Sequence, residues 1–126
     1  MITKLVVKKV FLNTFYLSEK IFEFIKKKNF SIDIQIIRDG EMILDTGGGI
    51  LNMINNSKEN DFLVLNPDTL WNEEYVNEVN KMQSFYFLKK INCILLMANK
   101  ALSFDKNLKG DFSIKDNLLK KDDNKN

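Results

Sequence analysis

The sequence predicts an α/β fold in which helices cover both faces of a mostly parallel sheet. Segments of strand and helix character alternate along the chain in the order β-α-β-α-β-α-β, and the connections between them are short. Two of the expected strands are apolar on both sides, as strands between two helical layers are. Such alternation favours parallel strands joined by right-handed crossovers, and these sheets bind ligands beyond the carboxyl ends of their strands.

The first strand, helix and second strand are each predicted by a local pattern. Residues 5–13 (LVVKKVFLN) are rich in β-branched and apolar side chains, and KVFLN at 9–13 is the better strand core. Residues 17–28 (LSEKIFEFIKKK) have the apolar spacing of a helix, for which Ser18 is the expected N-cap. Residues 31–39 (SIDIQIIRD) alternate isoleucines with polar side chains, which is typical of a half-exposed strand. The helical stripe consists of Leu17, Ile21, Phe24 and Ile25.

The second half of the pattern contains the two apolar runs. Residues 41–44 (EMIL) predict a short extended piece, and residues 50–54 (ILNMI) have the spacing of a short helix. Residues 61–66 (DFLVLN) and 91–98 (INCILLMA) are near-continuous apolar runs, and they predict two fully buried strands. Between these runs Asn72 is the expected N-cap of a further helix.

The length of the chain, 126 residues, suggests one domain. We expect residues 1–118 to form this domain and residues 119–126, which are mostly polar, to form a disordered tail. Between residue 98 and the tail, the pattern indicates a loop that ends in a short strand. No capping element follows, so the domain is expected to be incomplete.

The composition excludes several classes of function. The formal net charge is +2 and the basic residues are scattered, so neither nucleic acid nor a membrane is an expected partner. The sequence has no histidine, which excludes Ser-His-Asp and Cys-His catalysis and histidine-ligated metals. Its one cysteine, Cys93, lies in an apolar run, so a buried and unreactive thiol is expected. There is no signal peptide and no apolar run of membrane-spanning length, so the cytoplasm is the expected location.

Three consecutive glycines, Gly47, Gly48 and Gly49, precede the short helix expected at 50–54, and Thr46 is its expected N-cap. A helix N-terminus offers unpaired N–H groups and a positive dipole end, and glycines there let a nucleotide lie directly against the backbone. The alternative is a tight corner between strand and helix, which the spacing alone favours equally. The stretch matches neither the P-loop nor the G-x-G-x-x-G pattern.

Asp68 comes directly after the expected strand 61–66 and is a candidate metal ligand. Mg²⁺ prefers one or two carboxylates together with phosphate oxygens, and an aspartate beyond a parallel strand can supply one of them. An ordinary turn or helix-capping aspartate is the equal alternative. Asp111, in the GDF of residues 110–112, is a weaker pocket candidate because Gly-Asp is also common turn chemistry.

Taken together, these residues resemble those of the sugar-1-phosphate nucleotidyltransferases, a family that includes mannose-1-phosphate guanylyltransferases and N-acetylmuramate-1-phosphate uridylyltransferases. The resemblance runs from KVFLNTFYLSEKI through ILDTGGGI and DFLVLNPDT to KGDF, and so covers most of the chain. It implies a Rossmann-like three-layer sandwich with a mostly parallel sheet, here incomplete. It also implies a reaction in which a nucleoside triphosphate and a sugar 1-phosphate give an NDP-sugar and pyrophosphate, with Mg²⁺ as cofactor.

The resemblance implies a role for each candidate residue. Thr46 and the glycines Gly47–Gly49 would touch the nucleotide base. Asp68 would ligate Mg²⁺, while Asn66 and the pair Gly110–Asp111 would line the nucleotide or sugar-phosphate pocket.

The sequence also departs from the family pattern. The family opens with a glycine-rich loop whose arginine grips the triphosphate, followed by a Lys-Pro pair, and nothing in this chain matches either feature. Members usually have glycine where this chain has Pro67, which fixes φ and removes an N–H. The chain alone is therefore expected to be a weak or inactive catalyst. There are three alternatives: a non-catalytic nucleotide-binding or regulatory module, half of a split enzyme completed by a second chain, and an unrelated α/β domain.

Overall fold

The computed structural model describes residues 1–105, 107, 109–110, 112–116 and 118–121. The chain divides into two compact units, Met1–Lys81 and Met82–Asn126, and each is described here by itself. The described residues form a mixed α/β structure with three α-helices and two small sheets, one of which is a parallel pair.

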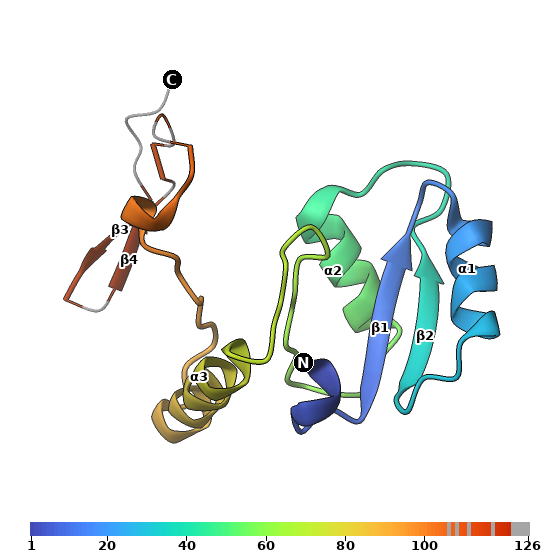
Figure 1. The fold of residues 1–126 in the computed structure, drawn as a ribbon, viewed down its shortest axis with the longest axis horizontal. Coiled ribbons are helices and arrows are strands. Elements are labelled where there is room, and N and C mark those ends of the chain that lie inside the picture. Colours follow the sequence, from blue (N-terminus) through green and yellow to red (C-terminus); the bar gives the residue numbers. More distant parts are fainter. Residues whose placement is uncertain (106, 108, 111, 117, 122–126) are drawn as a thin grey trace. The chain divides into compact units, whose positions relative to one another are not determined.

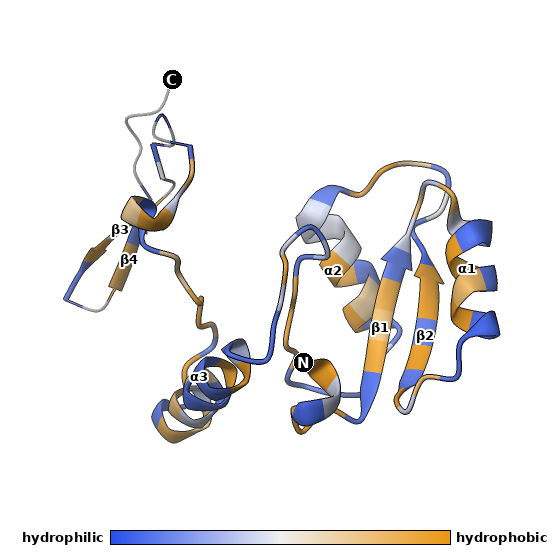
Figure 2. Ribbon diagram, viewed as in Figure 1, coloured by the Kyte–Doolittle hydropathy of each residue, from blue (hydrophilic) through white to orange (hydrophobic). Residues whose placement is uncertain are grey.

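The first unit contains the strand, helix and strand that the sequence predicts at its start. β1 (Lys9–Thr14) leads into α1 (Ser18–Lys27), and α1 leads into β2 (Asp33–Arg38), which lies parallel to β1 (Figure 1). Parallel neighbours need a crossover between them, and α1 is that crossover. The middles of both strands are largely hydrophobic, whereas the carboxyl end of β1 is polar (Figure 2). The predictions for these three elements are confirmed.

Helices cover both faces of this two-stranded sheet. The register pairs Asn13 with Ile37 and Thr14 with Arg38, so Asn13 and Arg38 belong to opposite faces by strand alternation. Arg38 forms an ion pair with Glu19 of α1. Asn13 lies against Gly49 of α2 (Asp45–Asn55). The first unit therefore has α1 on one face of the sheet and α2 on the other.

The helix α1 begins one residue before the expected position. Ser18 is already its first residue, and the N-cap is Leu17, which has a left-handed backbone (φ 54°) and makes no side-chain capping bond. The prediction of Ser18 as N-cap is therefore wrong, because a hydroxyl inside the first turn no longer faces the free N–H groups. Lys26 and Lys27 lie in the last turn, where positive charge stabilises the helix dipole.

The helix α2 begins earlier than the sequence predicts. It starts at Asp45 with Leu44 as its N-cap, and neither Leu44 nor Thr46 caps it through a side chain. The prediction of Thr46 as N-cap is therefore wrong. Asp45 has a left-handed backbone (φ 53°), which lets the chain enter the helix before the glycines. Residues 41 and 42 lie in a turn and a bend, and residues 43 and 44 are irregular, so no extended piece forms there. Gly47–Gly49 lie inside α2.

The two strands predicted at residues 61–66 and 91–98 are not formed, so that prediction is wrong. Val64 is 46% exposed and Leu95 is 50% exposed. The apolar composition of these runs favours burial of their side chains. A central parallel strand also needs a neighbouring strand at each edge to pair with its backbone. Among the described residues, β1 pairs only with β2, so neither run gains a neighbour there.

Polar contacts organise the chain before α3 (Tyr75–Lys89), a helix that begins in the first unit and ends in the second. The Asn72 side-chain oxygen accepts a hydrogen bond from the Glu74 N–H (3.0 Å) in the turn before the helix. Because α3 begins only at Tyr75, the prediction of Asn72 as its N-cap is wrong. Glu73 forms an ion pair with Lys4 of the 3₁₀ turn Ile2–Lys4 (2.7 Å). The buried hydrophobic side chains of the first unit are those of Leu5, Ile37 and Val79.

The described part of the second unit contains an antiparallel hairpin and a 3₁₀ turn. The turn spans Lys100–Leu102, and the hairpin pairs β3 (Phe112–Lys115) with β4 (Leu118–Lys121). β3 confirms the short strand expected near the end of the chain. β4 includes residues 119–121, which the sequence assigns to a polar tail. Cys93 is exposed, so the expectation of a buried thiol is wrong.

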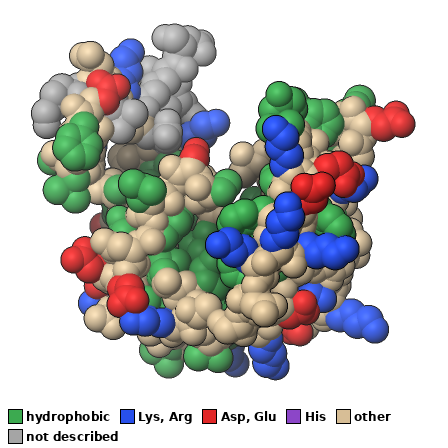
Figure 3. Space-filling view, turned by 45° about the vertical axis from the view of Figure 1, so that its right-hand side comes forward, with side chains coloured by type: hydrophobic (Ala, Val, Ile, Leu, Met, Phe, Trp, Pro, Cys, Tyr) green, Lys and Arg blue, Asp and Glu red, His purple; other side chains and the backbone are tan. Residues whose placement is uncertain are grey.

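Hydrophobic side chains reach the surface of the described structure in many places, as the green atoms in Figure 3 show. They belong to helices as well as to irregular segments, and the most exposed include Val6, Leu70, Leu88 and Phe104. None of the described helices is both long enough and apolar enough to cross a membrane.

Candidate functional site

The carboxyl ends of β1 and β2 form the edge at which the sequence predicts ligand binding. The arrowheads of both strands and the first turn of α2 lie at the same end of the first unit (Figure 1). The backbone N–H of Asp39 donates to the Thr14 carbonyl oxygen (2.9 Å), which continues the pairing of the two strands by one residue. Asp39 is thereby fixed at the edge of the sheet, next to the polar end of β1.

The carboxylate of Asp39 accepts hydrogen bonds from two side-chain amides on two other elements. Asn13 Nδ2, at the end of β1, donates to Asp39 Oδ2 (2.9 Å). Asn52 Nδ2, in the middle of α2, donates to Asp39 Oδ1 (3.1 Å) and lies at the same distance from the Arg38 carbonyl oxygen. Because one end of this network is in the sheet and the other is in α2, it joins the helix to the strand ends. We call Asn13, Asp39 and Asn52 the Asp39 network.

Gly49 is buried directly beside this network. A Cβ on Gly49 would lie 2.6 Å from Asn13 Nδ2 and 3.8 Å from Asp39 Oδ2. Separations under 3 Å are shorter than van der Waals contact, so any side chain would displace the Asn13 amide. The packing of the chain itself therefore favours glycine at position 49.

The other two glycines of α2 differ from Gly49 and from one another. A Cβ on Gly48 would lie 2.9 Å from the Cβ of Leu44, so this position is also restricted. A Cβ on Gly47 would meet no atom within 4 Å, and Gly47 is exposed. Neither has the left-handed backbone that favours glycine. The fold itself thus gives no steric or backbone reason for glycine at position 47.

Asn66 and Asp68 lie in a bend that is held by Trp71. The Trp71 indole N–H donates to the Asn66 carbonyl oxygen (3.0 Å), and the Thr69 N–H donates to the same oxygen (3.4 Å). Trp71 in turn packs edge-on against Tyr75 at the start of α3, with 5.0 Å between ring centroids. Its contacts are therefore structural.

The Asp68 side chain is exposed and makes no hydrogen bond or ion pair with the residues that the structure describes. No group of three or more Asp, Glu, Cys or His side chains gathers in the described part of the chain. Asp68 therefore offers one carboxylate. A single carboxylate fits Mg²⁺ that arrives with phosphate oxygens, and it does not form a protein-only metal cage.

The last pair of predicted pocket residues is only partly described. Gly110, in the second unit, has φ +69°, a left-handed conformation that glycine adopts without strain. Asp111 lies outside the described residues. The structure thus explains Gly110 as a backbone requirement and does not bear on the role predicted for Asp111.

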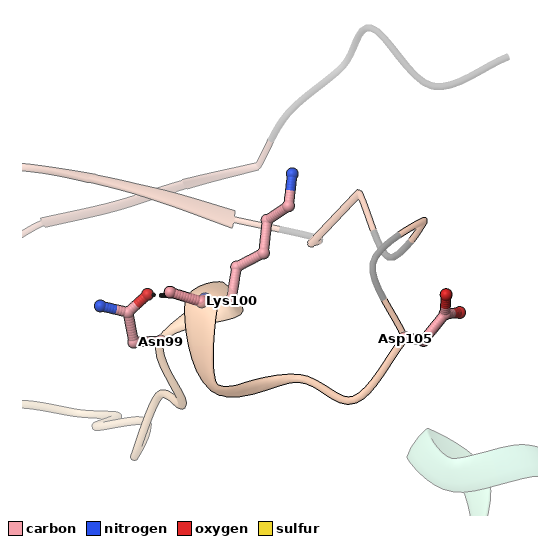
Figure 4. Close-up of a pocket in the computed structure, with 4 residues that line it drawn as sticks. Asn99, Lys100 and Asp105 are labelled. Atoms are coloured by element: carbon pink, nitrogen blue, oxygen red, sulfur yellow. Dashed lines mark hydrogen bonds between the residues drawn. The ribbon is translucent and has the colours of Figure 1, made fainter.

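The second unit also has an open hollow, which is lined by residues that the sequence does not single out (Figure 4). Asn99 Oδ1 accepts a hydrogen bond from the Ala101 N–H (2.9 Å) and so caps the 3₁₀ turn. The side chains of Lys100 and Asp105 do not point toward one another. The described residues that line the hollow therefore form no convergent set of polar groups of the kind that fixes a ligand.

The chain matches no protein-family model, no curated protein and no solved structure.

The Asp39 network was not predicted as part of the site, although the sequence contains a signal for it. Asn13 ends the first predicted strand, and Asp39 ends the second. The rule that ligand-binding groups follow the carboxyl ends of parallel strands applies to both residues. Asn52 has no comparable signal, because its role depends on how α2 is rotated against the sheet.

Proposed function

We propose that this chain is a nucleotide-binding domain of the sugar-1-phosphate nucleotidyltransferase type, with the nucleotide base lying against the first turn of α2. In this proposal, the β1–α1–β2 unit and α2 are part of a Rossmann-like three-layer sandwich. Thr46, Gly47 and Gly48 contact the base, and Asn66 lines the same pocket. Gly49, which is buried, lets α2 pack against the Asp39 network behind this turn. The support comes from the residues at the strand ends and from the resemblance of ILDTGGGI and DFLVLNPDT to that family.

The observation that carries this proposal is the unexplained glycine at position 47. Glycine inside a helix costs about 1 kcal/mol relative to alanine. The neighbours of Gly47 leave room for a side chain, and its backbone is not left-handed. A flat ligand that lies directly on the backbone accounts for the glycine, since any Cβ would hold that ligand away.

The geometry favours a base contact over a phosphate grip at this turn. A phosphate cradle of the P-loop kind pairs backbone N–H groups with a lysine that follows the glycines, and here Ile50 follows them. Asp45 also places a carboxylate in the first turn of α2, which disfavours a phosphate at the same N–H groups. A base edge carries no net charge and is compatible with both features.

In the proposed complex, Asp68 holds Mg²⁺ together with phosphate oxygens of the bound nucleotide. Mg²⁺ supplies charge neutralisation at the phosphates when it is bound. The Asp68 carboxylate has no competing partner among the described residues, and Trp71 fixes the bend that carries it.

We expect slow turnover or none from this chain alone. Arg38 is the only arginine in the sequence, and it pairs with Glu19 on the face of the sheet opposite Asn13. A guanidinium held in this way does not supply the triphosphate grip that the family places in its first loop. This observation favours a binding or regulatory module, or an enzyme that a second chain completes, over a complete enzyme.

Calorimetric titration of the 126-residue protein with GTP and with UTP, each with Mg²⁺, tests the proposal. We expect one of the two nucleotides to bind. We expect Gly47→Ala to weaken that binding about tenfold, or 1.4 kcal/mol. Asn55→Ala, at the exposed far end of the same helix, is the matched control and should leave affinity unchanged. Absence of binding, or equal affinity in Gly47→Ala and the wild type, would contradict the proposal.

A further inference from the structure

We infer that Asp39 is a positioning residue that holds the start of α2, including Gly47–Gly49, in place at the carboxyl ends of β1 and β2. We call this segment the glycine turn. The inference rests on the proposed function for what this turn binds. The claim that Asp39 fixes α2 stands on the hydrogen bonds alone.

The contacts of Asp39 span the three elements that build the edge of the sheet. Its backbone bonds to Thr14 at the end of β1, and its two carboxylate oxygens accept from Asn13 and Asn52. Asn52 lies three residues beyond Gly49, which is close to one helical turn. The network therefore holds α2 one turn away from the glycines and on the side that faces the sheet.

One further hydrogen bond, from Asn52 to the Arg38 carbonyl oxygen (3.1 Å), also joins α2 to the strand ends. The helix α2 makes no side-chain capping bond at its start and has no basic residue in its last turn. Leu51, on its surface, is 58% exposed. The two carboxylate oxygens accept from side chains on different elements, so these bonds together are well suited to fix the rotation and height of α2.

The network depends on Asp39 as an acceptor and not on its charge. In Asp39→Asn, the oxygen of the new amide still accepts from Asn52, and its nitrogen donates to Asn13 once the Asn13 amide turns over. The Asn13 side chain makes no other hydrogen bond with the described residues, so this rotation of its amide breaks no further bond. Asp39→Ala removes both carboxylate acceptors, so Asn13 loses its hydrogen bond and Asn52 keeps only the one to the Arg38 carbonyl oxygen.

Amide hydrogen exchange on the full chain, without nucleotide, tests the structural half of the inference. We expect Asp39→Ala to speed exchange of the α2 amides about tenfold or more, while the α1 amides change little. Asp39→Asn should stay close to the wild type. Unchanged α2 exchange in Asp39→Ala, or equal effects of the two substitutions, would overturn the inference.

Titration of the same variants with GTP and UTP in the presence of Mg²⁺ tests the functional half. Asp39→Ala should lose nucleotide affinity about tenfold, and Asp39→Asn should retain it. If Asp39 instead touched a ligand through its charge, both substitutions would lose affinity, and this outcome would overturn the inference. A wild-type protein that binds neither nucleotide would contradict the proposed function, and the exchange comparison alone would then decide the role of Asp39.

Discussion

Gly47 and Gly49 lie two residues apart near the start of α2, and only Gly49 is enclosed by other side chains. The sequence presents three equivalent glycines, for which a ligand contact and a tight corner are equal alternatives. The structure separates them, because a missing side chain has a steric reason at position 49 and none at position 47. The corner explanation fails in its original form, since the glycines are inside the helix and not before it.

Substituting alanine for each of these glycines should change stability in opposite directions. Gly49→Ala displaces the Asn13 amide from Asp39, a bond to a charged group worth roughly 1.5–3 kcal/mol. The gain in helix propensity, about 1 kcal/mol, offsets part of this loss. Urea denaturation should therefore show a net loss of about 1 kcal/mol for Gly49→Ala. Gly47→Ala should instead gain about 0.5–1 kcal/mol.

A double-mutant cycle provides the control for this prediction. Asn13→Ala removes the atom that the new Cβ would meet, so Gly49→Ala should no longer destabilise the protein in that background. A loss of the same size in both backgrounds would show that Asn13 is not the cause.

At the scale of the elements, the parts of the fold that could be predicted are those with a local cause. The stripe Leu17–Ile25 and the alternation of isoleucines specify α1 and β2 within their own residues. The start of α2 could not be predicted in this way, because it depends on left-handed Asp45, and aspartate enters that conformation only in a suitable context. Of the candidate site, the strand-end location was predictable, whereas Asn52 depends on packing between elements.

The ion pair between Lys4 and Glu73 is an element-scale contact that should respond to pH. The hydrogen bond and charge of Lys4 lower the pKa of Glu73 below its ordinary 4.5. A lowered pKa in the folded state means that the contact stabilises the fold above pH 4.5. This contribution is lost as the pH falls through the lower, folded-state value. The effect should be small because Glu73 is exposed.

An NMR titration of the glutamate side chains measures this directly. The Glu73 midpoint should lie below 4.5 in the wild type and should return toward 4.5 in Lys4→Met. A Glu73 midpoint that Lys4→Met leaves unchanged would show that the ion pair does not form in solution.

At the scale of the whole molecule, few hydrophobic side chains of the described residues are buried and many are exposed. The runs 61–66 and 91–98 have the composition of buried strands, yet in the described structure they are unpaired. The sequence could predict that these runs favour burial, because the apolar character of their side chains is visible in the sequence itself. It could not establish their pairing, since a parallel strand depends on neighbours that are distant in sequence.

Amide exchange should distinguish these runs from the paired strands. We expect the backbone amides of 61–66 and 91–98 to exchange much faster than those inside β1 and β2, because no ladder protects them. Protection equal to that of β1 would mean that the runs are strands in solution, as their composition predicts.

In the proposed complex, a nucleotide lies against the first turn of α2. The most direct test is to follow the backbone amide NMR signals of the full chain while GTP or UTP is added with Mg²⁺. We expect the largest changes to fall on Thr46 and Gly47–Gly49, with further changes in the bend that contains Asp68. No change on addition of either nucleotide, or changes confined to residues outside these two segments, would contradict it.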